Sequence, residues 1–388
     1  MALLNNEQVA SQIGDFVENA VGKSLSRPHR KPPVLGPKPR KNTWYRVPIE
    51  KGLSGDGSEY HIYVSKGTSD KLCIILSGGG VAWNDFTAAR PVTGGRVAAG
   101  LPNYYWNNLR PFTQIMNIHI GITDKRNPLN PFSDWNFVVI TYSTGDFHVG
   151  QGAMSYVDEE GKDATLHFHG YENFRESMKV AKKLFPNPSQ ILLAGNSAGA
   201  FAVPALAPDV KEDFYPDCQS ITLFSDSGQL LYADWAKTAR DLWHAKEEIV
   251  APLCSDNITL DWYRDLYRRY GDAFQYLYGS SIRDYLLSTY YNDMAHKTYG
   301  TNSEVQEIFY QQLCTMVKEL KELNPHFTMY LYNMTIPGIT QGGTVHTALK
   351  ELYFTTMKSD GVTMAKWLHD ATEGNLYDVG LSLLDSEH

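Results

Sequence analysis

The chain has 388 residues, 43% of them hydrophobic, so it can bury the core of one large α/β domain with insertions or of two domains. Its formal net charge of −8 argues against a nucleic acid or an anionic membrane as partner, because both favour basic surfaces. Four dispersed cysteines (Cys73, Cys218, Cys254 and Cys314) form no C-x-x-C pair, which argues against structural zinc.

The first predicted element is an amphipathic helix over residues 3–22. Its apolar positions recur at roughly helical spacing: Leu4, Val9, Ile13, Phe16, Val17 and Val21. A basic, proline-rich stretch follows to about residue 41 and indicates an extended linker. We therefore divide the chain into residues 1–41, the helix and linker, and residues 42–388, the main domain.

Apolar runs of strand length alternate with helical patterns through the main domain. Buried strands are predicted at residues 61–64, 72–76, 137–142, 190–194, 221–225, 287–291 and 327–333, and helices at residues 171–185 and 303–322. The alternation predicts an α/β-hydrolase-like fold, a mainly parallel sheet with helices on both faces. Residues 230–284 show helical periodicity and no clear strand, so we expect a helical insertion that forms a wall or lid of the active site.

A glycine-rich loop, Ser77-Gly78-Gly79-Gly80-Val81-Ala82-Trp83, follows the strand predicted at 72–76. A glycine backbone can present N–H groups to an oxyanion without obstruction by side chains. We expect Gly79 and Gly80, together with Ala198, to form an oxyanion hole, and Trp83 to contact the substrate. The alternative is a plain flexible turn.

A polar segment, residues 144–150, follows the next predicted strand and contains Asp146 and His148. We expect these two side chains to shape the floor of the site or to contact the substrate. His167 and His169 form a H-x-H pair, so three histidines and an aspartate could build a metal site. The pair is a weak signal and no carboxylate spacing completes it, so we expect neither a metal nor another cofactor.

The sequence Gly195-Asn196-Ser197-Ala198-Gly199 comes directly after the strand predicted at 190–194. G-x-S-x-G between a strand and a helix is the nucleophile elbow of serine hydrolases, in which the serine backbone is strained and the glycines avoid clashes. We therefore predict Ser197 as the nucleophile, with the N–H of Ala198 directed at a developing oxyanion.

An α/β-hydrolase needs an acid and then a histidine after the nucleophile. Asp293 follows the strand predicted at 287–291, where the acid of this fold usually lies, and is preferred to Asp226, which follows the strand at 221–225. Either could instead be a helix N-cap. His346 follows a glycine-rich loop after the last strand and is the predicted general base; His369 and His388 are less suitable because they lie on a predicted helix and at the terminus.

These segments together resemble the pectin acetylesterase/Notum family of carboxylesterases, and its bacterial-type members in particular. The matching segments are 77–80 with Trp83-Asn84, 121–122, 127–128, 130–132, 134–136, Tyr142 with 144–148, 169–170, the elbow, 225–228 and 346–347. They extend from about residue 43 to 350, nearly the whole hydrolase domain.

The resemblance implies a Ser-Asp-His esterase that removes short acyl groups, typically acetyl from pectin-like polysaccharides, whereas the Notum branch removes a lipid from a protein. Ser197 and His346 match the family pattern well and Asp293 less well, while Asp226 belongs to a Ser-Asp-Ser-Gly segment that frames the site. Many members carry cysteines where this chain has Val81-Ala82 and Asn196.

The N-terminus shows no apolar run of signal-peptide length after a positive region, and no stretch approaches the ~20 apolar residues of a membrane span. A cytoplasmic protein is therefore expected, with secretion by an unrecognised route as the alternative; plant and animal members of the family are secreted. A cytoplasmic enzyme would not meet polymeric pectin, so the expected substrate is a small-molecule or oligosaccharide ester.

The predicted function is removal of acetyl groups from O-acetylated carbohydrate by a serine carboxylesterase that forms an acyl-enzyme. One alternative is an esterase for longer acyl chains or lipids. The other is a non-catalytic carbohydrate-binding homologue, for which a broken triad would be expected.

Overall fold

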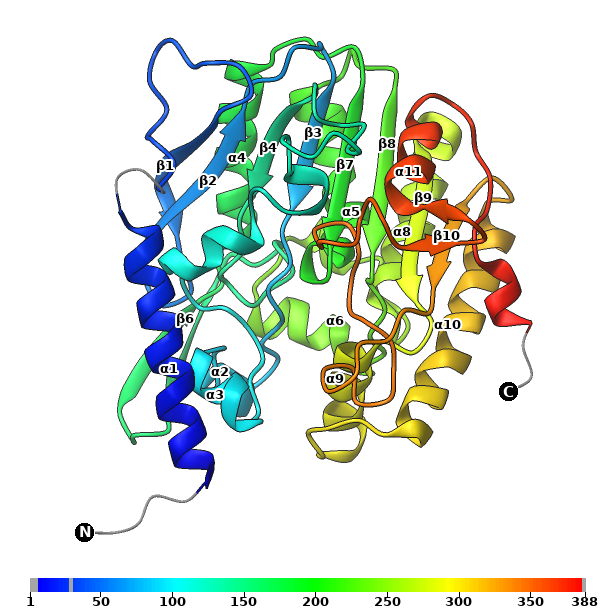
Figure 1. Ribbon diagram of the computed structural model, residues 1–388. Helices are drawn as coiled ribbons and strands as arrows, with labels where there is room; N and C mark the ends of the chain where they lie inside the picture. Colours follow the sequence, from blue (N-terminus) through cyan, green and yellow to red (C-terminus); the bar gives the residue numbers. More distant parts are fainter. Residues whose placement is uncertain (1–5, 28–30, 386–388) are drawn as a thin grey trace.

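The computed structural model describes residues 6–27 and 31–385 and is built on an eight-stranded sheet in the order β1-β2-β4-β3-β7-β8-β9-β10 (Figure 1). From β4 to β10 all neighbouring strands are parallel, and β1 and β2 add an antiparallel edge. The strands are β1 Trp44–Leu53, β2 Glu59–Ser65, β3 Leu72–Leu76, β4 Asn136–Ile140, β7 Ile191–Asn196, β8 Ile221–Asp226, β9 Gln275–Ser281 and β10 Thr328–Tyr332. Two short hairpins stand apart from the sheet: β5 Ala153–Val157 with β6 Asp163–His167, and β11 Lys358–Ser359 with β12 Val362–Thr363.

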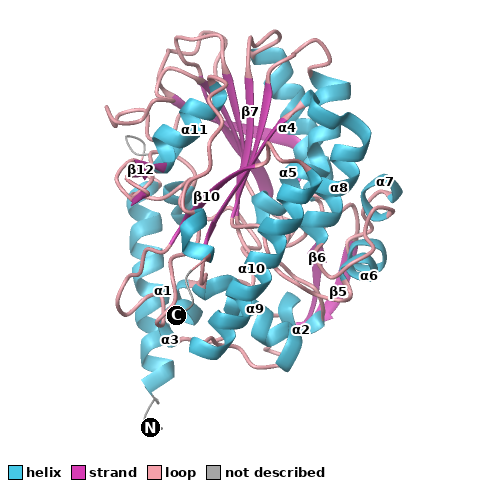
Figure 2. Ribbon diagram, turned by 90° about the vertical axis from the view of Figure 1, so that its right-hand side faces the viewer, coloured by secondary structure: helices cyan, strands magenta, loops and turns pink. Residues whose placement is uncertain are grey.

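Helices cover both faces of the sheet: α4, α5 and α8 lie on one side and α11 on the other (Figure 2). The helices are α1 Asn6–Leu25, α2 Asp85–Ala88, α3 Gly94–Ala99, α4 Gly170–Leu184, α5 Ala198–Asp209, α6 Trp235–Lys237, α7 Glu247–Val250, α8 Ile258–Tyr270, α9 Tyr285–His296, α10 Ser303–Leu323 and α11 Met364–Thr372. Shorter helical turns are η1 Pro111–Met116, η2 Gly121–Thr123, η3 Val210–Phe214, η4 Thr238–Leu242, η5 Gly271–Ala273 and η6 Leu381–Leu384. The α/β-hydrolase-like fold expected from the sequence is confirmed.

Strand β3 shows why these sequences form the centre of a sheet. Its side chains alternate between two hydrophobic cores, and all are fully buried. Leu72, Ile74 and Leu76 pack in the core that contains α4 and α5, whereas Cys73 and Ile75 pack in the core under α11. A strand covered on both faces has no polar side, which explains why its sequence is a continuous apolar run.

Helix α1 packs against α3 and η1 with small and acidic residues. Gly14 lies so close to Gly94 of α3 that a Cβ at either position would clash with the other helix. Asp15 accepts a hydrogen bond from the N–H of Gly95 (2.8 Å), at the amino end of α3, where a negative charge stabilises a helix. The sequence predicted this helix over 3–22; its Leu4 lies outside the described residues.

The stretch after α1 runs alongside the sheet. The backbone of Leu35 donates to the carbonyl of Arg46 in β1 (3.0 Å), and that of Arg46 donates to Pro33 (2.9 Å). No helix in the described part of the chain is long and apolar enough to span a bilayer.

Two predicted elements are wrong, and both lie in the same part of the chain. Residues 287–291 belong to helix α9, not to a strand, because a short apolar run suits a buried helix as well as a strand. The predicted helical insertion does contain α6, α7 and α8, but its end, residues 275–281, is strand β9 of the central sheet. The strand that follows β8 was therefore predicted at residues 287–291, whereas it lies at residues 275–281.

Candidate active site

Ser197 lies between strand β7 and helix α5, in the strained conformation of a nucleophile elbow. Its φ and ψ are 53° and −126°, a region that side-chain-bearing residues rarely adopt. A Cβ at Gly195 would overlap the carbonyl group of Gly199, and a Cβ at Gly199 would overlap that of Leu76. Both glycines of the motif are therefore required for the strand, the turn and the helix to pack this closely.

A continuous chain of hydrogen bonds starts at this serine. The Nε2 atom of His346 lies 2.8 Å from Ser197 Oγ, and its Nδ1 atom lies 2.6 Å from Oδ2 of Asp284. Asp284 is fully buried and the His346 side chain is 11% exposed. A proton on Nδ1 bonds the carboxylate and leaves Nε2 free to accept the serine proton, which is the tautomer that general-base catalysis requires.

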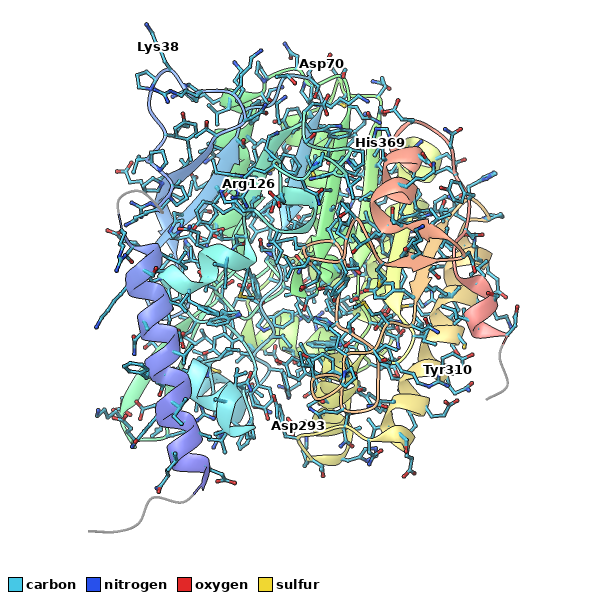
Figure 3. All side chains as sticks on the ribbon, in the orientation of Figure 1. Lys38, Asp70, Arg126, Asp293, Tyr310 and His369 are labelled. Carbon is cyan, nitrogen blue, oxygen red and sulfur yellow. The ribbon has the colours of Figure 1, made fainter. Side chains whose placement is uncertain are left out.

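The carboxylate that bonds His346 in this series of hydrogen bonds is Asp284, not the predicted Asp293. Asp293 lies on α9, at the lower end of the molecule in Figure 3, and accepts a hydrogen bond from the Tyr104 hydroxyl (3.0 Å). The acid was predicted after the strand that follows β8; that strand is β9, and Asp284 follows it. A further signal was available: Asp284 precedes an apolar helix, and its Oδ1 caps that helix at Leu286 and Leu287 (3.0 Å each).

The loop that carries His346 is fixed to the segment that carries Asp284. The backbone of Thr344 donates to Arg283 (2.8 Å), and Tyr285 donates to Thr344 (3.1 Å), as in a short parallel bridge. The position of the imidazole relative to its carboxylate is therefore set by the backbone as well as by the side-chain bond.

Asp226 fixes the same loop from its other end instead of contacting substrate. It is fully buried, and its Oδ2 accepts the N–H groups of Ala348 and Leu349 (2.7 Å each). Its Oδ1 accepts the Tyr332 hydroxyl (3.1 Å). Because these donors use the carboxylate, Asp226 holds the backbone just after His346 and is not free to bind a ligand.

Removing this carboxylate should destabilise the protein. Asp226→Ala leaves the N–H groups of Ala348 and Leu349 buried without an acceptor, and we expect a loss of about 2–4 kcal/mol in the free energy of unfolding. Denaturant unfolding followed by fluorescence measures this loss, with the exposed Asp217→Ala as control. Equal stability of Asp226→Ala and the wild type would show that the His346 loop does not depend on Asp226.

The glycine-rich loop lies directly against the elbow. The N–H of Gly78 bonds the Asn196 side chain (3.3 Å), and a Cβ at Gly78 would lie 2.7 Å from the Cβ of Ser197. Gly80 has φ +81°, and a side chain there would overlap the carbonyl of Tyr104. Gly79 and Gly80 line the same cavity as Ser197. Ala198, the residue after Ser197, is buried, with 1% of its surface exposed.

The other predicted substrate contacts are buried beneath the site. Trp83 is 5% exposed and packs edge-on against Tyr104, with ring centroids 5.0 Å apart. Asp146 is fully buried and accepts the N–H groups of His148 (3.1 Å) and Gly170 (2.8 Å). The Trp83 ring packs against another aromatic ring and the Asp146 carboxylate is bonded by backbone N–H groups, so both side chains support the site from inside the protein.

His148 also has a supporting position. It is 1% exposed, and its Nε2 atom lies 2.9 Å from the carbonyl oxygen of Ser77. Burial lowers the pKa of His148 to about 4, so the ring is neutral and donates its Nε2 proton to that carbonyl. Among residues 6–27 and 31–385, no group of three His, Cys, Asp or Glu side chains is arranged to hold a metal ion.

A cavity of about 1260 Å³ opens beside Ser197 and His346. Aliphatic residues form much of its lining: Leu25, Val92, Val97, Leu101, Ile115, Met116, Ile118, Ile120, Leu286, Ile339 and Leu352. Aromatic lining residues are Trp106, Tyr142, Tyr285, Tyr290 and Tyr299. The walls thus come from α1, α3, η1, α9 and the loop after β10, and no described lining residue comes from the predicted insertion at 230–284.

The charged groups of the cavity include Arg126, Lys350 and Glu351 (Arg126 is labelled in Figure 3). Burial disfavours the charged imidazolium of His346, but Asp284, with smaller contributions from Asp226 and Glu351, outweighs it and raises the pKa of His346. Burial also raises the pKa of Glu351 to about 7.

Comparison with known proteins places the chain in a family. A family model described as pectinacetylesterase matches residues 50–251, a range that includes the glycine-rich loop and Ser197. The chain belongs to the pectinacetylesterase family. Asp284 and His346 lie beyond the matched range, and no curated protein matches the chain.

Among solved structures, the Wnt deacylase Notum from Drosophila is similar to this pectinacetylesterase-family chain. The TM-score is 0.55 at 15% sequence identity, over 86% of this chain and 94% of that one. At this identity the likeness concerns the fold. The family match and the shared fold support a carboxylic ester hydrolase of the pectinacetylesterase–Notum type.

The cytoplasmic location predicted from the sequence is contradicted by these relatives. Pectinacetylesterase and Notum homologues are secreted, extracellular enzymes. The prediction depended on the absence of a recognisable leader, and an absent leader does not determine where a protein acts. The argument that polymeric substrates are out of reach therefore no longer holds.

Proposed function

We propose that this protein is a serine carboxylesterase that removes acetyl groups from O-acetylated carbohydrate. The observation that carries the proposal is the hydrogen-bonded chain from Ser197 through His346 to Asp284 at the edge of a large cavity. Membership of the pectinacetylesterase family supports acetyl as the acyl group that is removed. No metal or organic cofactor is needed for this chemistry.

In the proposed reaction, Ser197 Oγ attacks the ester carbonyl while His346 Nε2 takes the serine proton. Asp284 stabilises the resulting imidazolium through Nδ1. The imidazolium then gives its proton to the leaving alcohol, and the acyl group stays on Ser197. His346 next activates a water molecule, which releases the carboxylic acid and regenerates the serine.

The tetrahedral intermediate carries a negative oxygen that needs donors already in place. The backbone N–H groups of Gly79, Gly80 and Ala198 remain the proposed donors. Two observations support this assignment: the glycines line the cavity beside Ser197, and Ala198 is the first residue of helix α5, where backbone N–H groups carry partial positive charge.

An esterase for longer acyl chains is a second candidate, favoured by the aliphatic cavity wall. An acetyl group needs little room, whereas a cavity of about 1260 Å³ with so many aliphatic side chains could receive a long chain. An oligosaccharide attached to a small acyl group would also fill it. Cavity size therefore supports a large substrate without assigning its large part to the acyl or the alcohol side.

Hydrolysis of p-nitrophenyl esters from acetate to palmitate, followed by acetylated oligosaccharides and acetylated pectin, tests the proposal. We expect fast, Ser197-dependent turnover of acetate that declines by butyrate. A preference for long chains would replace the proposal with the second candidate. No Ser197-dependent turnover of any ester would favour the non-catalytic carbohydrate-binding alternative.

The pH dependence should follow the ionisation of His346. The base must be neutral, so kcat/KM should rise with pH as His346 loses its proton, and its raised pKa puts this rise above pH 6.5. Glu351→Gln removes a negative charge that favours the imidazolium, so the rise should move to lower pH. The exposed Glu160→Gln serves as control, and an unchanged or higher midpoint in Glu351→Gln would contradict the electrostatic account.

A further inference from the structure

Lys350 lies four residues after His346, and it is buried. It is 3% exposed and lines the cavity beside the candidate nucleophile. Its Nζ atom donates to the Ser77 hydroxyl and to Oδ1 of Asn117, both at 3.0 Å. Both oxygens are uncharged, and burial lowers the pKa of Lys350 to about 7. Burying a lysine in this way is costly, which suggests that its position serves a purpose other than stability.

Ser77 is the first residue of the glycine-rich loop and is bonded on several sides. Its N–H donates to Ile140 (3.0 Å), and its carbonyl accepts the His148 ring (2.9 Å). Its hydroxyl accepts from Lys350 and donates to Asn117 (2.8 Å). The next residue is the glycine that lies against the Cβ of Ser197. A displacement of Ser77 would therefore move the proposed oxyanion donors relative to the nucleophile.

Asn117 follows η1, which forms one wall of the cavity. It is 5% exposed, and its side-chain amide donates to Thr113 within that turn (2.9 Å). The amine of Lys350 thus joins three segments that are distant in the sequence: the His346 loop, the glycine-rich loop and η1. Each contributes a different part of the site, namely the base, the proposed oxyanion donors and the cavity wall.

We propose that Lys350 is a positioning residue that holds the glycine-rich loop in the correct place relative to His346 and Ser197. The inference rests on the proposed function, because it concerns stabilisation of the oxyanion. Lys350 acts through Ser77 and takes no part in bond making. Displacing oxyanion donors weakens binding of the transition state more than binding of the substrate, so its loss should lower kcat and leave KM nearly unchanged.

Lys350→Met tests this inference in the full chain. Methionine has a similar length without the amine, and Ser77 and Asn117 keep their own hydrogen bond, so the variant should fold. With p-nitrophenyl acetate we expect kcat to fall by ~10- to 100-fold while KM changes by less than about threefold. Lys366→Met, an exposed lysine on α11, is the matched control and should behave as wild type.

A double-mutant cycle with Ser77→Ala tests the route of the effect. If Lys350 acts through Ser77, adding Ser77→Ala to Lys350→Met should lower kcat no further, whereas independent roles would make the effects multiply. Lys350→Ala removes the same atoms that propylammonium contains. Added propylammonium should therefore restore kcat to Lys350→Ala, which is also the variant to use if Lys350→Met does not fold.

The possible outcomes separate this inference from the proposed function. Wild-type kcat in Lys350→Met, a rise in KM alone, or multiplying effects in the cycle would overturn the positioning role and leave the esterase proposal intact. An absence of Ser197-dependent turnover in the wild type would overturn both. A fall in kcat that the second mutation does not increase, and that propylammonium reverses, would support the role.

Discussion

Replacing Ser197 by alanine should reduce kcat for ester hydrolysis by at least ~10³-fold while the protein stays folded. The hydroxyl is the only part of Ser197 that the proposed reaction uses, and it contacts His346 at 2.8 Å. Alanine keeps the Cβ and fits wherever serine does. What remains would be the small acceleration from the oxyanion donors and from binding alone.

The measurement is steady-state hydrolysis of p-nitrophenyl acetate with circular dichroism and thermal unfolding of each variant. Ser58→Ala removes an exposed hydroxyl in the turn between β1 and β2 and is the control for loss of any serine. If Ser197→Ala retained more than about a tenth of wild-type kcat, the elbow would not supply the nucleophile.

Asp284→Asn should lower kcat by ~10⁴-fold, by analogy with the effect of the same change in other serine triads. The amide cannot act as the anion that stabilises the imidazolium, and it favours the wrong tautomer of His346. Asparagine caps helices as well as aspartate does, so the start of α9 should be preserved. The large loss should therefore appear in kcat and not in stability.

Asp293→Asn is the matched control, because it changes a carboxylate to an amide on the same helix. Its bond to Tyr104 can be kept by the amide oxygen, and we expect kcat within about threefold of wild type. The pair of variants decides between the two acids. A large loss in Asp293→Asn together with an active Asp284→Asn would reverse the assignment.

Much of the fold could be predicted because buried parallel strands have a simple sequence signature. Strand β3 was predicted at its observed bounds, since all its residues are apolar and all are buried. Strand β9 was missed for the opposite reason: its sequence, QYLYGSS, contains polar and small residues, yet six of its seven residues are buried. Strands β8 and β10 flank it on either side, and Thr222 of β8 donates to the Gln275 side chain (2.6 Å); a single sequence does not show those neighbours.

The candidate site shows the same limit. Ser197 and His346, which lie 2.8 Å apart, could be singled out because each occupies a sequence context with its own chemistry, a strained elbow and a glycine-rich loop after the last strand. The error in the acid followed directly from the missed strand. Asp146 and Asp226 also lie at strand ends, but sequence cannot reveal that buried backbone N–H groups use their carboxylates.

Lys350 was not singled out from the sequence at all. It stands in an ordinary segment, His346-Thr347-Ala348-Leu349-Lys350, and lysine there suggests an exposed residue. Its burial depends on three segments meeting in space: the His346 loop, the glycine-rich loop and η1. Such a residue becomes visible only in the folded structure.

The most direct test of the central claim is covalent labelling with a fluorophosphonate, a probe that phosphonylates an activated serine. We expect intact-mass spectrometry to show one adduct per chain, peptide mapping to assign it to Ser197, and His346→Ala and Asp284→Asn to slow its formation strongly. An unlabelled wild-type protein, or an adduct on another residue, would contradict the claim that Ser197, His346 and Asp284 form one catalytic unit.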